Sequence, residues 1–211
     1  MRSRTQNTGA ALLASLTVLA LGAVAAASCS RRREPAAVAA PAAGGSATPA
    51  APGALAEPDA GHLRDRRLMV PVEGVRPEDV PNTFLAARGT TRTHNALDIL
   101  AARGTAVLSA DDGRVYRLRS NRAGGLTVYA VDPDERFVYY YAHLDRYREG
   151  LTEGEPLSKG EVLGYVGSTG NARPNEPHLH FQVMRMGAER HWWDGRPVDP
   201  KPYLVMEGKR R

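Results

Sequence analysis

From Leu97 onward the sequence is a succession of short β-prone segments separated by turn residues, and this pattern constrains the fold most strongly. Gly124-Gly125 and the stretch 132–134 (Asp-Pro-Asp) are turn signals between neighbouring segments. No helical periodicity of useful length accompanies them. We therefore expect a mainly β fold, a single antiparallel sheet domain with little helix. The expected strands are 97–100, 106–110, 113–118, 126–131, 137–143, 162–166 and 178–183.

The N-terminal residues 1–29 have the pattern of an export signal. Arg2 and Arg4 form a basic start, and the apolar run 10–27 ends in small residues. The sequence Ala-Ala-Ser-Cys at 26–29 is similar to a bacterial lipobox, which predicts lipid on Cys29. Ordinary secretory cleavage after Ala27 and an uncleaved transmembrane anchor remain alternatives, since the apolar run approaches the ~20 residues that span a bilayer. All three place the rest of the chain outside the cytoplasm.

Residues 30–61 change to an Ala/Pro-rich composition. Proline recurs through this stretch and large apolar residues are rare, so we expect a disordered linker. The globular domain is expected at 62–206, and 207–211 form a basic tail. A linker of this kind would let an anchored domain search its surroundings.

Charge and cysteine content exclude several functions. The chain of 211 residues carries a net charge of +5 without a clustered Lys/Arg stripe, which argues against a nucleic-acid partner. A single cysteine excludes an internal disulfide and a Cys-rich zinc site. Any metal site must therefore use His and carboxylate ligands.

The triplet His178-Leu179-His180 is the first candidate for such a site. On a strand, His178 and His180 share one face with Gln182, while the apolar residues between them face the core. Two imidazoles about 7 Å apart can converge on one centre. The alternative is that both are polar residues on the solvated face of an edge strand.

His94 and Asp98 are candidates for the remaining ligands, because zinc accepts both imidazole nitrogen and carboxylate oxygen. In a straight strand four residues span roughly 13 Å, so the Asn95-Ala96 region must bend if both are to reach one ion. Taken alone, the pair is equally well explained as a surface histidine and an unrelated aspartate.

Together these motifs resemble the M23 (lysostaphin-like, LytM-type) metallopeptidase family over about residues 70–204. The resemblance implies the family's duplicated hybrid-motif β fold and one Zn²⁺ held by His94, Asp98 and His180, with water in the fourth position. It also implies that His143 and His178 handle protons and stabilise the substrate carbonyl. The matching segments are His94–Asp98, Tyr141–Leu144, His178–His180, Gly164–Asn171 and Gly195–Pro200.

The function implied by the resemblance is a zinc-dependent endopeptidase that hydrolyses peptide bonds in bacterial peptidoglycan. The cleaved bond would lie either in a stem-peptide cross-link or in an interpeptide bridge. One alternative is a non-catalytic LytM-like wall-binding module that activates an amidase, although such proteins lose zinc ligands. A muramidase with paired carboxylates is another, but it would leave the clustered histidines unexplained.

Four features lie outside this constellation or depart from it. Ala96 stands where the family usually has glycine, and a positive φ there would cost about 1 kcal/mol. His62 and His191 match no motif and are expected to be exposed loop residues. Trp192-Trp193 either line a groove or pack over the end of the sheet.

Overall fold

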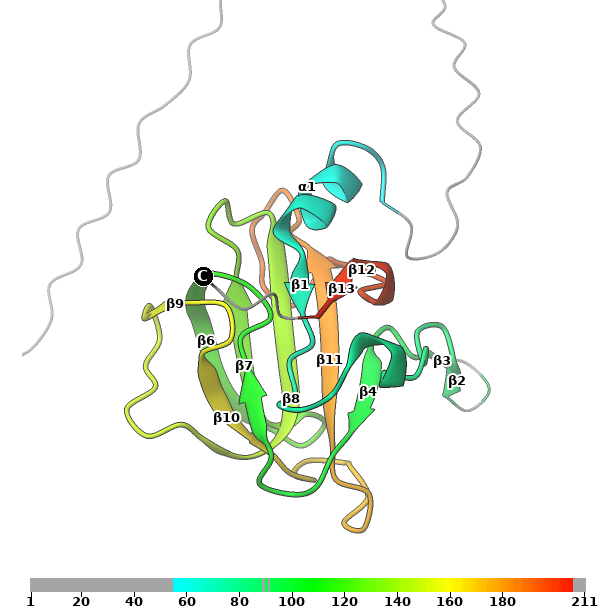
Figure 1. Ribbon diagram of the computed structural model, residues 1–211, viewed down its shortest axis with the longest axis vertical. Helices are drawn as coiled ribbons and strands as arrows, with labels where there is room; N and C mark the ends of the chain where they lie inside the picture. The colour runs from blue at the N-terminus through cyan, green and yellow to red at the C-terminus, as the bar shows by residue number, and fades with distance from the viewer. Residues whose placement is uncertain (1–54, 89, 91, 207–211) are drawn as a thin grey trace, which may run out of the picture. The chain divides into compact units, whose positions relative to one another are not determined.

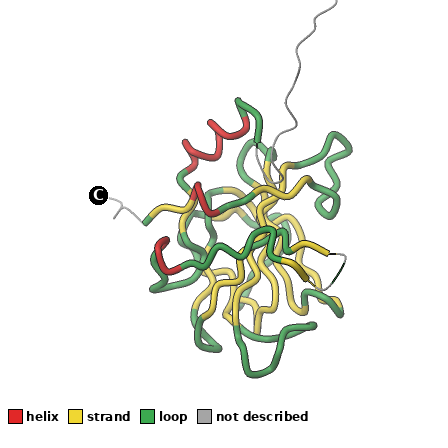
Figure 2. The backbone as a smooth tube through the Cα atoms, turned by 90° about the vertical axis from the view of Figure 1, so that its right-hand side faces the viewer, coloured by secondary structure: helices red, strands yellow, loops and turns green. Residues whose placement is uncertain are grey.

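The computed structural model describes residues 55–88, 90 and 92–206, and strands dominate this part of the chain (Figure 1). In the rotated view of Figure 2, strands fill most of the tube and helix is confined to short segments. Within the described residues, the helical segments are α1 (Asp59–Arg66) and the 3-10 helices η1 (Pro77–Asp79) and η2 (Lys201–Tyr203). The expected mainly β fold with little helix is confirmed.

Nine strands form the main sheet, and all of their pairings are antiparallel. The order β12-β11-β8-β7-β6-β9 forms the main path, β4 pairs with β11, and β10 pairs with both β8 and β5. The strands are β4 (Leu97–Leu100), β5 (Ala106–Leu108), β6 (Gly113–Asn121), β7 (Gly125–Val131), β8 (Phe137–Tyr147), β9 (Pro156–Leu157), β10 (Val162–Val166), β11 (His178–Arg185) and β12 (Arg196–Val198).

Several strands are longer than the sequence pattern indicated. β8 continues to Tyr147, four residues beyond the expected end, because its C-terminal part pairs with β10 across a register shift. β6 likewise continues to Asn121 opposite β7. By contrast, β5 ends at Leu108, two residues short of the expected end. The turn at 132–134 falls between strands as expected, and the turn signal at 124–125 overlaps the first residue of β7, Gly125.

The core lies on one face of the sheet, where aromatic and branched side chains from adjacent strands meet. Tyr139 and Tyr141 of β8 and Leu179 and Phe181 of β11 are at most 1% exposed. Full burial of such a side chain stabilises the fold by roughly 1.5–3 kcal/mol, which fixes the register of each strand. Because β11 alternates, burying Leu179 and Phe181 forces its polar residues onto the opposite face.

Two small sheets accompany the main one. β1 (Leu68–Met69) and β13 (Leu204–Val205) pair in parallel, and β2 (Ala87–Arg88) and β3 (Arg92–Thr93) pair antiparallel. Strands of two residues carry too little periodicity to be recognised in a sequence. The first pair joins the two ends of the described domain, and the second lies beside β4 (Figure 1).

Helix α1 begins at Asp59, so its first three residues fall within the stretch 30–61 that composition assigns to a linker. Proline is tolerated at the start of a helix, and Pro58 immediately precedes α1. Leu63 is fully buried in the core, and its burial stabilises the helix. The preceding stretch has few large apolar residues that could do the same. Arg67, in the left-handed conformation with φ 49°, ends the helix.

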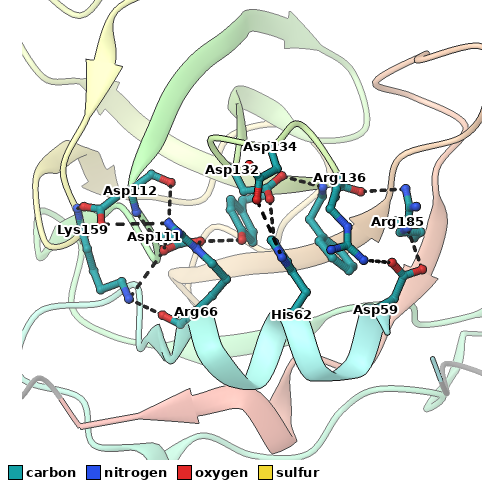
Figure 3. A network of polar contacts seen from close by, with 12 residues as sticks. Asp59, His62, Arg66, Asp111, Asp112, Asp132, Asp134, Arg136, Lys159 and Arg185 are labelled. Atoms are coloured by element: carbon teal, nitrogen blue, oxygen red, sulfur yellow. Dashed lines mark hydrogen bonds and ion pairs between the residues drawn. The ribbon is translucent and has the colours of Figure 1, made fainter. Parts of the chain in front are cut away.

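Charged side chains dock α1 onto the ends of the sheet strands (Figure 3). Asp59 pairs with Arg136 and Arg185, with Arg185 Nε donating to Asp59 Oδ2 at 2.8 Å. About two turns further along the helix, Arg66 donates two hydrogen bonds to the buried carboxylate of Asp111, at 2.7 and 2.8 Å. Asp59 and Arg66 are the first and last residues of α1, so the helix is held at both ends.

Other expectations for the chain ends lie outside the described residues. They are the signal or lipobox at 1–29, lipid on Cys29, most of the linker, and the basic tail at 207–211. Within the described part of the chain, no helix has the length and apolar character needed to cross a membrane.

Candidate active site

Strand β11 brings the two halves of the candidate site together. In the sheet register His180 lies opposite Asp98 of β4 on one side and opposite Ala142 of β8 on the other. The alternation expected for the His178–His180 triplet is present, with the two histidines half-buried and Leu179 fully buried. Both imidazoles therefore share the face of β11 opposite the core.

His94, Asp98 and His180 direct three ligand atoms at one point. His94 Nε2 lies 3.1 Å from both His180 Nδ1 and Asp98 Oδ1, and His180 Nδ1 lies 3.0 Å from Asp98 Oδ1. Ligands at about 2.0–2.1 Å from a tetrahedral ion are roughly 3.3 Å apart, so this triangle is close to one face of such a coordination shell. Both the donor set and its spacing fit a zinc ion.

The chain bends between His94 and Asp98, as their convergence requires. β3 ends at Thr93 and β4 begins at Leu97, so residues 94–96 belong to neither strand. Ala96 is fully buried and does not have a positive φ. The alanine at this atypical position therefore carries none of the backbone strain that a left-handed residue would pay.

His143 reaches the same face through a β-bulge. Strict alternation along β8 would place it with Tyr139 and Tyr141 on the core face. Instead the register with β7 shifts between Leu126 and Val128, and His143 has φ 63°. Its ring centroid lies 5.0 Å from that of His178 and 5.7 Å from that of His180. The bulge adds one residue and thereby turns His143 toward the site.

Backbone carbonyl groups orient three of the four imidazoles. The Nδ1 atoms of His94, His143 and His178 lie 2.9, 2.8 and 2.7 Å from the carbonyl oxygens of Thr83, Thr169 and Glu176, respectively. Because a carbonyl can only accept, each Nδ1 carries the proton and each Nε2 keeps a lone pair. The orientation of all three rings and the tautomer are thus set by the loops that surround the site.

The environment keeps the site's charge states suited to metal binding. Burial alone would raise the pKa of Asp98, but the adjacent imidazoles of His180 and His94 hold that pKa well below its usual range. Burial lowers the pKa of His180 and lowers the pKa of His143 to about 4. At neutral pH Asp98 is therefore a carboxylate, and the His143 and His180 rings are neutral.

The five side chains lie in an open groove of about 590 Å³. On one side the groove is lined by the β2–β3 hairpin, including Arg88 and Arg92, and on the other by the loop that carries Asn171 and Arg173. Arg88 also pairs with the second carboxylate oxygen of Asp98, which leaves Oδ1 for the ligand triangle.

Sequence reasoning missed Thr83, which supports the site from a loop before β2. Its carbonyl accepts from His94, and its hydroxyl accepts from the Asp98 backbone N–H at 2.9 Å and donates to the Ala96 carbonyl at 3.2 Å. The carbonyl of Thr169 similarly orients His143. A carbonyl contact leaves no signal in the identity of a residue. No motif marks Thr83, and the matching segment Gly164–Asn171 contains Thr169 without indicating its contact.

The two histidines outside the motifs have different surroundings. His191 lies in a loop and stacks on Trp193, as an exposed loop residue can. His62, expected to be an exposed loop residue, lies instead on α1 with its side chain 12% exposed, which corrects that expectation. Its Nε2 lies 2.8 Å from the buried carboxylate of Asp132, because α1 docks against the β7–β8 turn (Figure 3).

His62, Asp132 and Asp134 form a second group with metal-ligand atoms near one another. The two carboxylates approach opposite nitrogens of the ring, Asp132 at Nε2 and Asp134 at Nδ1, the latter at 3.8 Å. Asp132 also accepts the backbone N–H of Phe137 at 2.7 Å. These are contacts that dock a helix on a turn, and they do not converge on one centre.

Trp192 and Trp193 lie outside the groove. Trp192 packs edge-on against Tyr129, with ring centroids 4.4 Å apart, on the face of the sheet away from the main core. Trp193 is 59% exposed. Of the two expectations for this pair, packing over the sheet describes Trp192.

Two imidazole nitrogens and one carboxylate oxygen that leave one side open are the donor set of a catalytic metal centre, since structural zinc sites are closed by four protein ligands. Comparison with known proteins gives the family. Residues 92–200 match Peptidase family M23, and the chain belongs to this family.

Curated relatives are similar to this chain over its C-terminal half. It is 32% identical over 121 residues to the L-Ala–D-Glu endopeptidase of Bacillus subtilis, covering 55% of this chain and 36% of that protein. It is 29% identical over 111 residues to the peptidoglycan DD-endopeptidase ShyC of Vibrio cholerae, covering 53% and 24%. The chain thus spans about a third or less of the length of these two relatives.

Solved structures show the same fold. The catalytic domain of lysostaphin from Staphylococcus simulans superposes with a TM-score of 0.52 at 24% identity, covering 61% of this chain and 94% of that domain. LytU superposes with a TM-score of 0.51 at 27% identity, covering 59% and 83%. The lysostaphin-like architecture expected from the sequence is therefore confirmed.

Proposed function

We propose that the chain is a zinc-dependent endopeptidase that hydrolyses peptide bonds in bacterial peptidoglycan. The observation that carries this proposal is the triangle of His94 Nε2, Asp98 Oδ1 and His180 Nδ1, with edges of 3.0–3.1 Å, at the base of an open groove. Membership of a peptidase family supports it, as do relatives named as an L-Ala–D-Glu endopeptidase and a peptidoglycan DD-endopeptidase.

His94, Asp98 and His180 would hold one zinc ion. Bound there, zinc supplies Lewis acidity, which activates water and polarises a peptide carbonyl. The ionised Asp98 and the neutral His180 present their ligand atoms without a competing proton at neutral pH. Neutral imidazole and carboxylate are the forms in which these residues bind metal.

His143 and His178 are the candidates for proton transfer. Their Nδ1 protons are engaged by the carbonyls of Thr169 and Glu176, so the Nε2 lone pairs are available on the groove side. An imidazole in this position accepts a proton from the attacking water and returns one to the leaving amine, which typically contributes 10²–10⁴-fold. We assign the pair to acid/base catalysis and carbonyl stabilisation jointly.

Zymography on purified peptidoglycan, with metal analysis of each protein, tests the assignment. We expect His94→Ala and His180→Ala to lose both zinc and clearing. His143→Ala should keep zinc and lose 10²–10⁴-fold in rate, since it removes a proton-transfer group only. His191→Ala, which changes a half-exposed loop histidine outside the groove, is the matched control and should clear like the wild type. Equal clearing by His94→Ala and the wild type would reject the peptidase.

We further propose that the domain acts outside the cytoplasm, attached to a membrane through lipid on Cys29. The support is the sequence pattern at 1–29 and the wall-directed names of the relatives. Mass spectrometry of the membrane fraction should find lipidated Cys29 as the mature N-terminus. An intact Met1 would instead indicate an uncleaved anchor, and an unmodified N-terminus at Ser28 would indicate ordinary secretion.

A further inference from the structure

The β2–β3 hairpin at the edge of the groove carries two arginines in an unfavourable arrangement. Arg88 and Arg92 are direct cross-strand partners in the antiparallel register. Like charges placed directly opposite in such a pair destabilise it. Both side chains also line the groove that contains the metal-ligand triangle. The hairpin gains nothing from placing these two charges opposite each other, which indicates that the groove uses them.

The two arginines differ in how their charge is neutralised. Arg88 forms an ion pair with Asp98, whose other oxygen belongs to the ligand triangle. Arg92 is exposed, and among the described residues no hydrogen bond or ion pair involves its side chain. The charge of Arg92 is therefore available to a ligand in the groove.

The other charges of the groove do not cancel it. Arg173, in the loop across the groove, is paired with Glu176 at 3.1 Å, so these two neutralise each other. Asp98 is shared between Arg88 and the proposed metal. With zinc bound, the groove would carry further positive charge. The field within it therefore favours an anionic substrate.

We infer that the groove selects a peptide with a free carboxylate close to the cleaved bond, and that Arg92 binds this carboxylate. This inference rests on the proposed endopeptidase function and deepens it. A guanidinium and a carboxylate match in a planar, two-bond geometry, which gives both charge and direction. A preference for a free carboxylate favours one of the two expected substrate classes, a stem-peptide cross-link with free acid groups, over the other, an uncharged interpeptide bridge.

Two synthetic cross-linked peptides test the inference. They share one sequence and differ only in whether the carboxylates beside the cleaved bond are free or amidated. With the zinc-loaded wild type we expect kcat/KM to be about ten-fold higher for the free acid, the worth of one hydrogen bond to a charged group. This preference should weaken as salt is added.

Variants of Arg92 connect the preference to one side chain. Arg92→Gln should reduce the ratio of the two kcat/KM values to about two or less, while Arg92→Lys should keep part of it because the charge remains. Arg76→Gln removes an exposed arginine outside the groove and should keep the wild-type ratio. Zinc content and the unfolding midpoint are measured for each protein, so that loss of metal or fold is not mistaken for loss of selectivity.

The outcomes separate this inference from the function on which it rests. Equal cleavage of both peptides by the wild type, or an unchanged ratio in Arg92→Gln, would overturn the role of Arg92 and leave the endopeptidase standing. Cleavage of neither peptide by a zinc-loaded wild type would overturn both.

Discussion

Thr83 contributes more to the candidate site than any residue outside its motifs. It makes three hydrogen bonds to the segment 94–98 through two groups: its carbonyl bonds His94, and its hydroxyl bonds both Asp98 and Ala96. Hydrogen bonds of this kind orient metal ligands, and losing them typically costs 10–100-fold in metal affinity. The carbonyl contact depends on the path of the loop, which the hydroxyl contacts help to fix.

We expect Thr83→Val to weaken zinc binding about ten-fold, because valine keeps the shape of threonine and removes both hydroxyl contacts. Competition with a chromogenic chelator measures this affinity. Thr83→Ser keeps the hydroxyl and is the matched control, so its affinity should be close to that of the wild type. A Thr83→Val protein with unchanged zinc affinity would show that the backbone alone positions Asp98.

His143 shows at the residue scale why sequence reasoning reached only part of the site. Alternation places His178 and His180 on one face, and the structure agrees, since burial of Leu179 and Phe181 enforces it. Applied to β8, the same rule would turn His143 toward the core. Only the bulge, which depends on the pairing of β8 with β7, reverses this. The family resemblance pointed to His143, and no local pattern does.

At the scale of elements, the loop between β10 and β11 positions Thr169 through an unusually close approach of two glycines. A Cβ on Gly170 would lie 2.2 Å from the backbone nitrogen of Gly125. The Thr169 hydroxyl donates to the Leu144 carbonyl at 2.7 Å, next to the bulged His143. The loop and the β6–β7 turn therefore pack backbone against backbone, and His143 depends on both.

Gly170→Ala should destabilise the domain and misplace Thr169, while Gly150→Ala should do little. Both glycines have nearly the same φ, 75° and 76°, so an added Cβ costs each about 1–2 kcal/mol of backbone strain. Only Gly170 adds a clash, because no atom lies within 4 Å of the Cβ position at Gly150. Urea unfolding compares the two. Equal losses of stability would mean that the loop moves aside freely.

The elements that the sequence predicts are stabilised by their own residues, whereas the elements that it misses are stabilised by contacts with residues far away in the sequence. Strands such as 97–100 and 162–166 were predicted with correct bounds, because their own residues carry the β pattern. The parallel pair β1–β13 joins segments from opposite ends of the domain, and each strand has two residues. The first three residues of helix α1 fall within the expected linker 30–61, because the helix is supported by burial of Leu63 and by ion pairs to distant strands.

For the whole molecule, the docking of α1 makes the free energy of unfolding depend on pH. Partial burial of Asp59 opposes its ionisation, but hydrogen bonds from Arg136 and Arg185 hold its pKa below the ordinary value. A carboxyl group whose pKa is lowered by folding stabilises the fold at pH values above its unfolded-state pKa of about 3.9. This stabilisation is lost as the pH falls through the pKa of the folded state.

We expect Asp59→Asn to lower the free energy of unfolding by about 1 kcal/mol at pH 7, since it leaves two arginines without their partner. The difference from the wild type should shrink as the pH falls from about 5 to below 3.9. Urea unfolding at several pH values measures it. Asp65→Asn, on the same helix, is the control. A difference that stays constant with pH would mean that Asp59 acts through packing alone.

The parallel pairing of Leu68 with Leu204 places the two ends of the described domain next to each other. The ends could therefore be joined, and new termini could be opened elsewhere in the domain. A permutant that joins residue 206 to residue 59 through a linker of about eight to ten residues, and begins instead at Gly150, cuts an exposed turn, since no atom lies within 4 Å of the Cβ position at Gly150. We expect it to fold and to keep its zinc affinity, measured by chelator competition, because every ligand keeps its neighbours. This result would show that the site depends on how the strands are arranged in the sheet and not on their order in the sequence.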